Sequence, residues 1–221
     1  RVSIRSTRPL ATARVVIGRR AGDVAALVPR LYSVCARAQG AASASALESA
    51  TGRPPVPARI AARSFAVALE NLQEDLRRLL IDVPKAIGQA AVVEPVAAVR
   101  RAFAPVLAAA VRPGEADGAS APVAQHAIDM AIDTAVDVVS RNVLGESLAA
   151  FAARTDADGL ERWMRQATTA PALALRAVLD CGGRLGDSDV PTLPPMTRGQ
   201  VETILGSLAA DAGFAAAPRL D

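Results

Sequence analysis

A single cysteine at the expected start of a helix is the residue best placed for chemistry in this chain. Cys35 follows Arg30, and an alanine-rich helical run continues from it toward Gly52. Free N–H groups and the helix dipole favour a thiolate at such a position, and Arg30 and Arg37 add positive charge nearby in sequence. Cys35 is therefore a candidate metal ligand or reactive thiol. The alternative is a small buried hydrophobic residue, a common role of free cysteines.

The second cysteine gives a weaker signal. Cys181 precedes Gly182 and Gly183 at an expected helix end, where the helix dipole disfavours a thiolate. A structural role is favoured for it. A joint Cys35/Cys181 metal site stays open, although no spacing rule for metal ligands supports it.

The only histidine lies on a helical face with three acids. From His126, the positions i+4, i+7 and i+11 are Met130, Asp133 and Asp137, and Asp129 lies beside them. Histidine and carboxylates at such spacing can bind a metal. The favoured interpretation is a solvated acidic face on an otherwise basic protein. A docking face for an arginine-rich partner is the third possibility.

The sequence lacks the common catalytic motifs. It has no glycine-rich phosphate loop, no Cys-x-x-Cys and no His-Glu-x-x-His. Without a nucleophile elbow, the single histidine gives no support for a hydrolytic triad. The residues alone therefore predict a mostly helical protein with one thiol of interest and no recognisable catalytic set.

The composition predicts a mainly α-helical fold. Apolar residues make up 51% of the 221 residues but aromatic residues only 3%, and much of the apolar content is alanine, the best helix former. The net charge is +3, yet the arginines are spread along the chain and interleaved with acids. Because nucleic-acid-binding arms are more densely basic, no nucleic-acid partner is expected.

Cysteine usage and hydropathy bear on the compartment. Two cysteines make no disulfide framework, which favours a reducing, cytoplasmic location. No stretch of about 20 uncharged apolar residues is present, so no membrane span is expected. The chain begins at Arg1, and we expect a trimmed segment of a longer protein.

Apolar periodicity predicts a series of helices after a short β-hairpin. Residues 57–82 form the clearest helix, and Glu74 and Arg78 are spaced as a favourable i,i+4 ion pair. Its apolar stripe consists of Phe65, Leu69, Leu72, Leu76 and Leu79. The predicted hairpin spans residues 2–17, with Val15, Val16 and Ile17 as its second β-branched run. The other predicted helices span residues 21–31, 34–50 (with Ser33 as cap), 94–111 (interrupted or kinked at Pro105), 122–143, 146–154, 158–168, 171–180 and 198–212 (with Thr197 as cap). We expect residues 1–221 to form one domain, with a weak internal boundary near 112–121.

The order of features resembles the N-terminal half of a nickel–iron hydrogenase large subunit. Arg8-Pro9 precedes Val28-Pro29-Arg30-Leu31-Tyr32-Ser33-Val34-Cys35, and the helical segment 46–52 is followed by the long helix 70–80 and Asp82-Val83-Pro84. In that family an Arg-x-Cys-Gly-x-Cys motif carries two of the four cysteines that hold the nickel–iron centre. The resemblance implies a helical core like that of the large subunit.

Only part of that motif is present here. Arg30 matches the arginine and Cys35 the second cysteine, which bridges both metals in the family. Tyr32 stands where the nickel-only cysteine should be, Ser33 replaces the glycine, and Gln39 falls on the position of the family's histidine. Because soft thiolates hold nickel in this family, the departures imply that no nickel is bound.

The sequence also differs from active hydrogenase large subunits beyond this motif. Glu74 and Asp75 lie where the long helix of active subunits has a histidine, and the C-terminal Asp-Pro-Cys-x-x-Cys motif is absent. The sequence is similar instead to degenerate large-subunit relatives of the HupK/HoxV type, which act in hydrogenase maturation. That family is proposed to be a scaffold for iron carrying cyanide and carbon monoxide.

The resemblance implies a function, a site and partners. The expected function is a non-catalytic assembly scaffold, with Cys35 as iron ligand and with Arg30 and Gln39 near the cyanide and carbonyl groups. The expected partners are the hydrogenase large-subunit precursor and small HypC-like maturation chaperones. The alternative is a metal-free structural or interaction protein of the hydrogenase complex. An active hydrogenase subunit is the third reading, and the missing thiolates disfavour it.

Overall fold

The computed structural model describes residues 14–110, 125–182, 196–197 and 199–203. These residues are mainly helical, as the composition predicts, and no strand occurs among them. The chain divides into two compact units, Arg1–Pro54 with Ser188–Asp221, and Pro55–Asp187. The predicted boundary loop 112–121 lies outside the described residues.

The predicted N-terminal hairpin is wrong in the part that can be seen. Arg14 to Val16 form a helical turn, and the backbone N–H of Ile17 donates to the carbonyl of Arg14 over 3.3 Å. Arg19 Nε donates to the carbonyl of Val15 over 2.7 Å and holds this turn against the next residues. An isolated pair of short strands is marginal in water, so a local helical turn prevails over the β-branched run. Residues 2–13 lie outside the described part.

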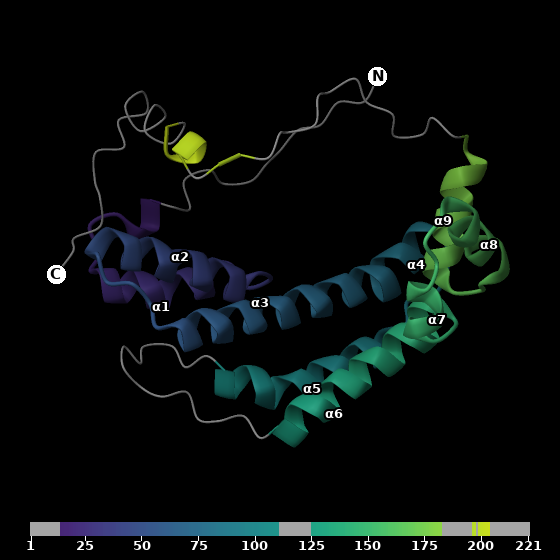
Figure 1. Cartoon of the computed structure of the whole chain (residues 1–221), viewed down its shortest axis with the longest axis horizontal. Coiled ribbons are helices and arrows are strands. Elements are labelled where there is room, and N and C mark those ends of the chain that lie inside the picture. The colour runs from purple at the N-terminus through teal and green to yellow at the C-terminus, as the bar shows by residue number, and fades with distance from the viewer. Residues whose placement is uncertain (1–13, 111–124, 183–195, 198, 204–221) are drawn as a thin grey trace. The chain divides into compact units, whose positions relative to one another are not determined.

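The first unit contains a pair of packed helices, α1 (Ala21–Leu31) and α2 (Ala36–Thr51), shown in Figure 1. Val24 of α1 is buried, and a Cβ added at Gly40 of α2 would lie 3.2 Å from Pro29 Cγ. The absence of a side chain at Gly40 thus permits close approach of the two helices. α2 ends at Gly52, in the left-handed conformation with φ of +64°, as the sequence predicts.

In the second unit a long helix continues farther than predicted. α3 (Pro57–Arg77) runs into a π-helical turn, η2 (Arg78–Asp82), and then into α4 (Val83–Ala86). The predicted helix ends at residue 82, since Pro84 lacks the N–H that would bond the carbonyl of Leu80. That carbonyl instead accepts from the backbone N–H of Val92 over 2.7 Å. The wider π turn and this substitute donor together allow the helix to pass Pro84.

Two further long helices complete the second unit's bundle. α5 (Val93–Ala110) continues through Pro105, whose ring is exposed, so the predicted interruption does not occur. α6 (Gln125–Val138) packs on α5 and runs into a second π-helical turn, η3 (Val139–Leu144). The short helices α7 (Leu148–Ala152), α8 (Ala157–Gln166) and α9 (Ala170–Asp180) follow, and Figure 1 shows them together at one end of the bundle.

The core of the second unit lies between α3, α5 and α6 and reaches α8 and α9. The predicted stripe of α3 contributes to it, with Leu69 and Leu76 buried and the other three members partly buried. Phe103 of α5 and Leu80 of η2 have no exposed surface. Buried members of the core are Leu69, Leu76, Leu80, Val96, Val99, Phe103, Val106, Ala131, Ala135, Val138, Val143, Leu144, Trp163, Met164 and Ala172.

Candidate functional site

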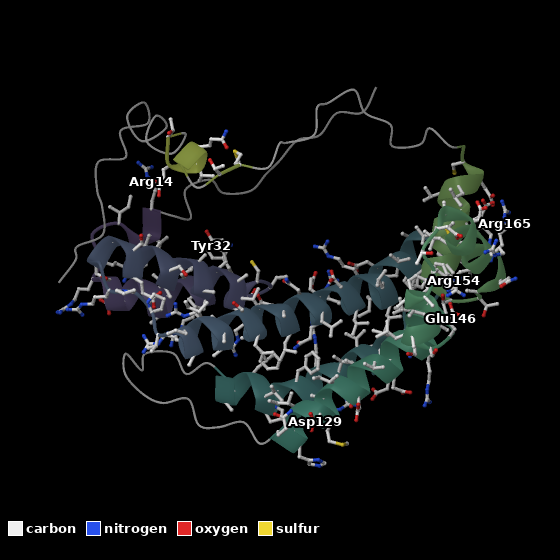
Figure 2. All side chains as sticks on the ribbon, in the orientation of Figure 1. Arg14, Tyr32, Asp129, Glu146, Arg154 and Arg165 are labelled. Carbon is white, nitrogen blue, oxygen red and sulfur yellow. The ribbon has the colours of Figure 1, made fainter. Side chains whose placement is uncertain are left out.

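The sequence motif around Cys35 lies in the turn that joins α1 to α2. The backbone N–H of Cys35 donates to the carbonyl of Tyr32 over 3.2 Å, which closes a four-residue turn with Ser33 and Val34 at its tip. Figure 2 labels Tyr32 at this junction. Ser33 was expected to cap the second helix, but the helix begins two residues later than that requires, and the capping position is Cys35.

Cys35 itself is half-buried and forms no disulfide. Its side chain makes no capping hydrogen bond, so the thiol does not satisfy the free N–H groups of the first turn of α2. Those N–H groups and the helix dipole add positive potential near the sulfur. The expected placement at a helix start is confirmed to within one residue, since α2 begins at Ala36.

The two residues predicted to accompany Cys35 lie on either side of it. Gln39 is half-buried one helical turn further along α2, and its backbone N–H donates to the carbonyl of Cys35 over 2.9 Å. Positions i and i+4 share a helix face, so Cys35 and Gln39 lie on one side of α2. Arg30 is exposed in the last turn of α1. Arg30, Cys35 and Gln39 therefore lie within ten residues of one another, on the two helix ends that this turn joins.

The other candidate residues lie in the second unit. Cys181 is exposed at the C-terminal end of α9. The joint site with Cys35, which the sequence leaves open without supporting it, is not tested by the structure. His126, Asp129, Met130, Asp133 and Asp137 are all exposed on α6, as the solvated-face interpretation requires. Within the described ranges, no group of three or more His, Cys, Asp and Glu side chains could hold a metal ion.

One electrostatic cluster was only partly anticipated. Glu74 accepts from Arg77 Nε over 2.8 Å and from Arg77 Nη2 over 2.7 Å. It also accepts from Arg78 Nε over 3.2 Å, which is the predicted i,i+4 pair. These hydrogen bonds, chiefly those of Arg77, lower the pKa of Glu74 to about 2. Arg77 also contacts Asp82 over 2.9 Å, five residues away, across the π-helical turn. An α-helical pattern gives no reason to pair residues five apart, so sequence analysis missed this contact.

No described helix is both long and apolar enough to cross a lipid bilayer.

Comparison with known proteins places the chain beside hydrogenase expression/formation proteins. It is 26% identical to HoxV of Cupriavidus necator over 220 residues, which is 97% of this chain and 53% of that protein. Over 80 residues it is 40% identical to HupV of Azotobacter chroococcum, and over 77 residues 38% identical to HupK of Bradyrhizobium diazoefficiens. The HupV match covers 36% of this chain and 23% of its relative, and the HupK match 35% and 21%.

These matches confirm the resemblance predicted from the sequence motifs. The chain spans about half the length of the HoxV relative. No family model matches the chain, and no solved structure matches it. The likeness of its fold to the hydrogenase large subunit therefore stays a prediction.

Proposed function

We propose, from this resemblance to hydrogenase expression/formation proteins, that the chain acts in hydrogenase maturation in a non-catalytic role. The support is the similarity to HoxV along 97% of the chain, together with shorter matches of higher identity to HupV and HupK. We further propose that its cargo is iron carrying cyanide and carbon monoxide. We expect no nickel, because Tyr32 stands where a second soft thiolate would be needed.

The observation that carries the cargo proposal is the position of Cys35. Cys35 is a half-buried thiol directly before the first turn of α2, outside any disulfide. A thiolate is a soft ligand suited to iron with such ligands. A single thiolate is too few ligands to hold a metal permanently. It suits a carrier, which must release its cargo.

Arg30 and Gln39 provide the polar chemistry that such a cargo needs. Cyanide bound to iron accepts hydrogen bonds, and a guanidinium fork donates several in a fixed geometry. Arg30 is exposed at the end of α1, and Gln39 shares the Cys35 face of α2. We propose that both donate to the cyanide or carbonyl groups. The partners would be the hydrogenase large-subunit precursor, which receives the cargo, and small HypC-like chaperones, which supply it.

The functional test is complementation in cells that lack this protein but hold the rest of the maturation machinery. Cys35→Ala should abolish hydrogenase activity in the cells, because the cargo loses its ligand. Cys181→Ala, the matched control at the other cysteine, should support full activity. If Cys35→Ala matures hydrogenase as well as the unchanged protein does, the cargo proposal is wrong. If the unchanged protein does not restore hydrogenase activity, the proposed role in maturation is wrong.

The alternative, a metal-free interaction protein of the hydrogenase complex, predicts a different pattern. The protein would then be required for maturation, but Cys35→Ala would complement and every purified complex would lack iron. The iron content of those complexes separates the two roles.

A further inference from the structure

The outward face of α6 combines apolar and acidic side chains. Ile132 and Val136, one turn apart, are exposed by 44% and 39%, and Met130 is exposed by 53%. Asp129 and Asp133 lie beside them at the same i,i+4 spacing. Figure 2 labels Asp129 near the beginning of α6.

This arrangement differs from the sequence-based expectation. Apolar periodicity along the predicted helix 122–143 places Ile132 and Val136 on its core-facing side. In the structure Ala131, Ala135 and Val138 occupy that side. Small residues therefore contact the core, and the larger β-branched residues remain on the surface. A helix with apolar residues on the outside as well as the inside has more apolar surface than its own bundle covers.

The acidic row on this face has little compensation within α6. Like charges at i and i+4 destabilise a helix by a few tenths of a kcal/mol per pair. Asp137 is paired with Arg141 over 2.7 Å, and Asp129 accepts from Gln125 over 2.8 Å. Asp133, between them, has no ion pair in the described part of the chain. A cationic partner would offset this repulsion.

We propose that the outward face of α6 docks a basic amphipathic helix of a partner protein. Apolar side chains of the partner would cover Ile132 and Val136, and its arginines or lysines would meet Asp129 and Asp133. A second copy of this chain is the poorer occupant, because a symmetric contact would set the aspartates of one α6 against those of the other. The proposal depends on α6 alone and is independent of the iron site.

The direct probe is a synthetic helical peptide about four turns long, with leucines at i,i+4 spacing and arginines along one flank. A peptide of the same composition with the leucines scrambled is its control. Fluorescence anisotropy with the whole protein should show saturable binding of the amphipathic peptide at about 50 mM salt, weakened at about 300 mM salt. The scrambled peptide should bind at least about fivefold more weakly, because it cannot cover Ile132 and Val136 together.

Two double variants locate the binding face. Asp129→Asn with Asp133→Asn, and Ile132→Ser with Val136→Ser, should each weaken binding by about fivefold or more. All four residues are exposed, and circular dichroism should confirm unchanged helix content. The matched control is Asp158→Asn with Leu160→Ser on α8, another exposed acid and apolar pair, which should leave binding unchanged. Absence of saturable binding, equal binding of the scrambled peptide, or equal losses in the α8 variant would each overturn the proposal.

Discussion

At the scale of single residues, two side chains donate hydrogen bonds to backbone carbonyls at the end of η3. Trp163 Nε1 donates to the carbonyl of Leu144 over 2.8 Å, and Thr169 Oγ1 to that of Val143 over 2.8 Å. These donors satisfy carbonyls at the end of η3, where a helix leaves its last carbonyls without partners. The partners are 19 and 26 residues apart, so no local pattern predicts them.

Trp163→Phe tests the first of these contacts. The change keeps an aromatic ring near Phe151, whose centroid lies 4.9 Å from that of Trp163, but it removes the indole N–H. The buried carbonyl of Leu144 would lose its donor, so the free energy of unfolding should fall by about 1–3 kcal/mol. Urea unfolding measures it. Leu160→Ala, an exposed change on the same helix, should cost less than about 0.5 kcal/mol, and an equal cost in the two variants would contradict the assignment.

Glu74→Gln tests the charge cluster on α3 through its pH dependence. The pKa of Glu74 is lowered from 4.5 to about 2 in the folded protein, chiefly by the hydrogen bonds from Arg77. A lowered folded-state pKa contributes stability above the unfolded pKa, and this contribution is lost as the pH falls from 4.5 toward 2. At pH near 7 the variant should therefore be less stable by about 1 kcal/mol.

The difference between Glu74→Gln and the unchanged protein should shrink toward zero near pH 2, as urea midpoints at several pH values would show. Glu94→Gln is the matched control, because Glu94 pairs with Arg101 in an ion pair whose two side chains are both exposed. It should show little difference at either pH. A Glu74→Gln effect that is independent of pH would exclude the proposed ion-pair origin.

At the scale of the elements, helix periodicity predicts most of what the structure contains. The helices at 57–82, 158–168 and 171–180 appear within a few residues of their expected ends, and Thr197 caps the last helix by accepting from the backbone N–H of Gln200 over 3.3 Å. The π-helical turns could not be predicted, since they arise where η2 and η3 pack together with α9. Ser33 does not cap α2, because Ser33 and Val34 lie in the turn that the Cys35–Tyr32 hydrogen bond closes. The helix begins only after this turn.

The end of α2 offers a test at this scale. Gly52 has a φ of +64°, and its backbone N–H bonds to the carbonyls of Glu48 and Ser49. Gly52→Ala meets no neighbouring atom but must adopt a conformation that L-residues avoid, so it should destabilise the first unit by about 1 kcal/mol. Gly22→Ala in α1, also without close neighbours, should instead stabilise by about 0.5–1 kcal/mol. Thermal unfolding followed by circular dichroism measures both, and the same sign for both would contradict the conformational argument.

At the scale of the whole molecule, the chain comprises two compact units, and the candidate iron ligand lies in the first. The position of Cys35 at a helix start could be predicted from the sequence, because the alanine-rich run that follows it favours a helix. The distance from Cys35 to residues beyond the first unit could not be predicted, because it depends on how helices far apart in the sequence assemble. The chain spans about half the length of the HoxV relative. The match of Tyr32 and Cys35 to the two cysteines of the hydrogenase motif stays a prediction from the sequence.

The most direct test of the central claim is infrared spectroscopy of the protein purified from cells that express the maturation machinery. Iron-bound cyanide and carbon monoxide absorb in a region where proteins do not. The account predicts these bands with stoichiometric iron in the unchanged protein and in Cys181→Ala, and their loss in Cys35→Ala. Cyanide and carbonyl bands that persist in Cys35→Ala would contradict it.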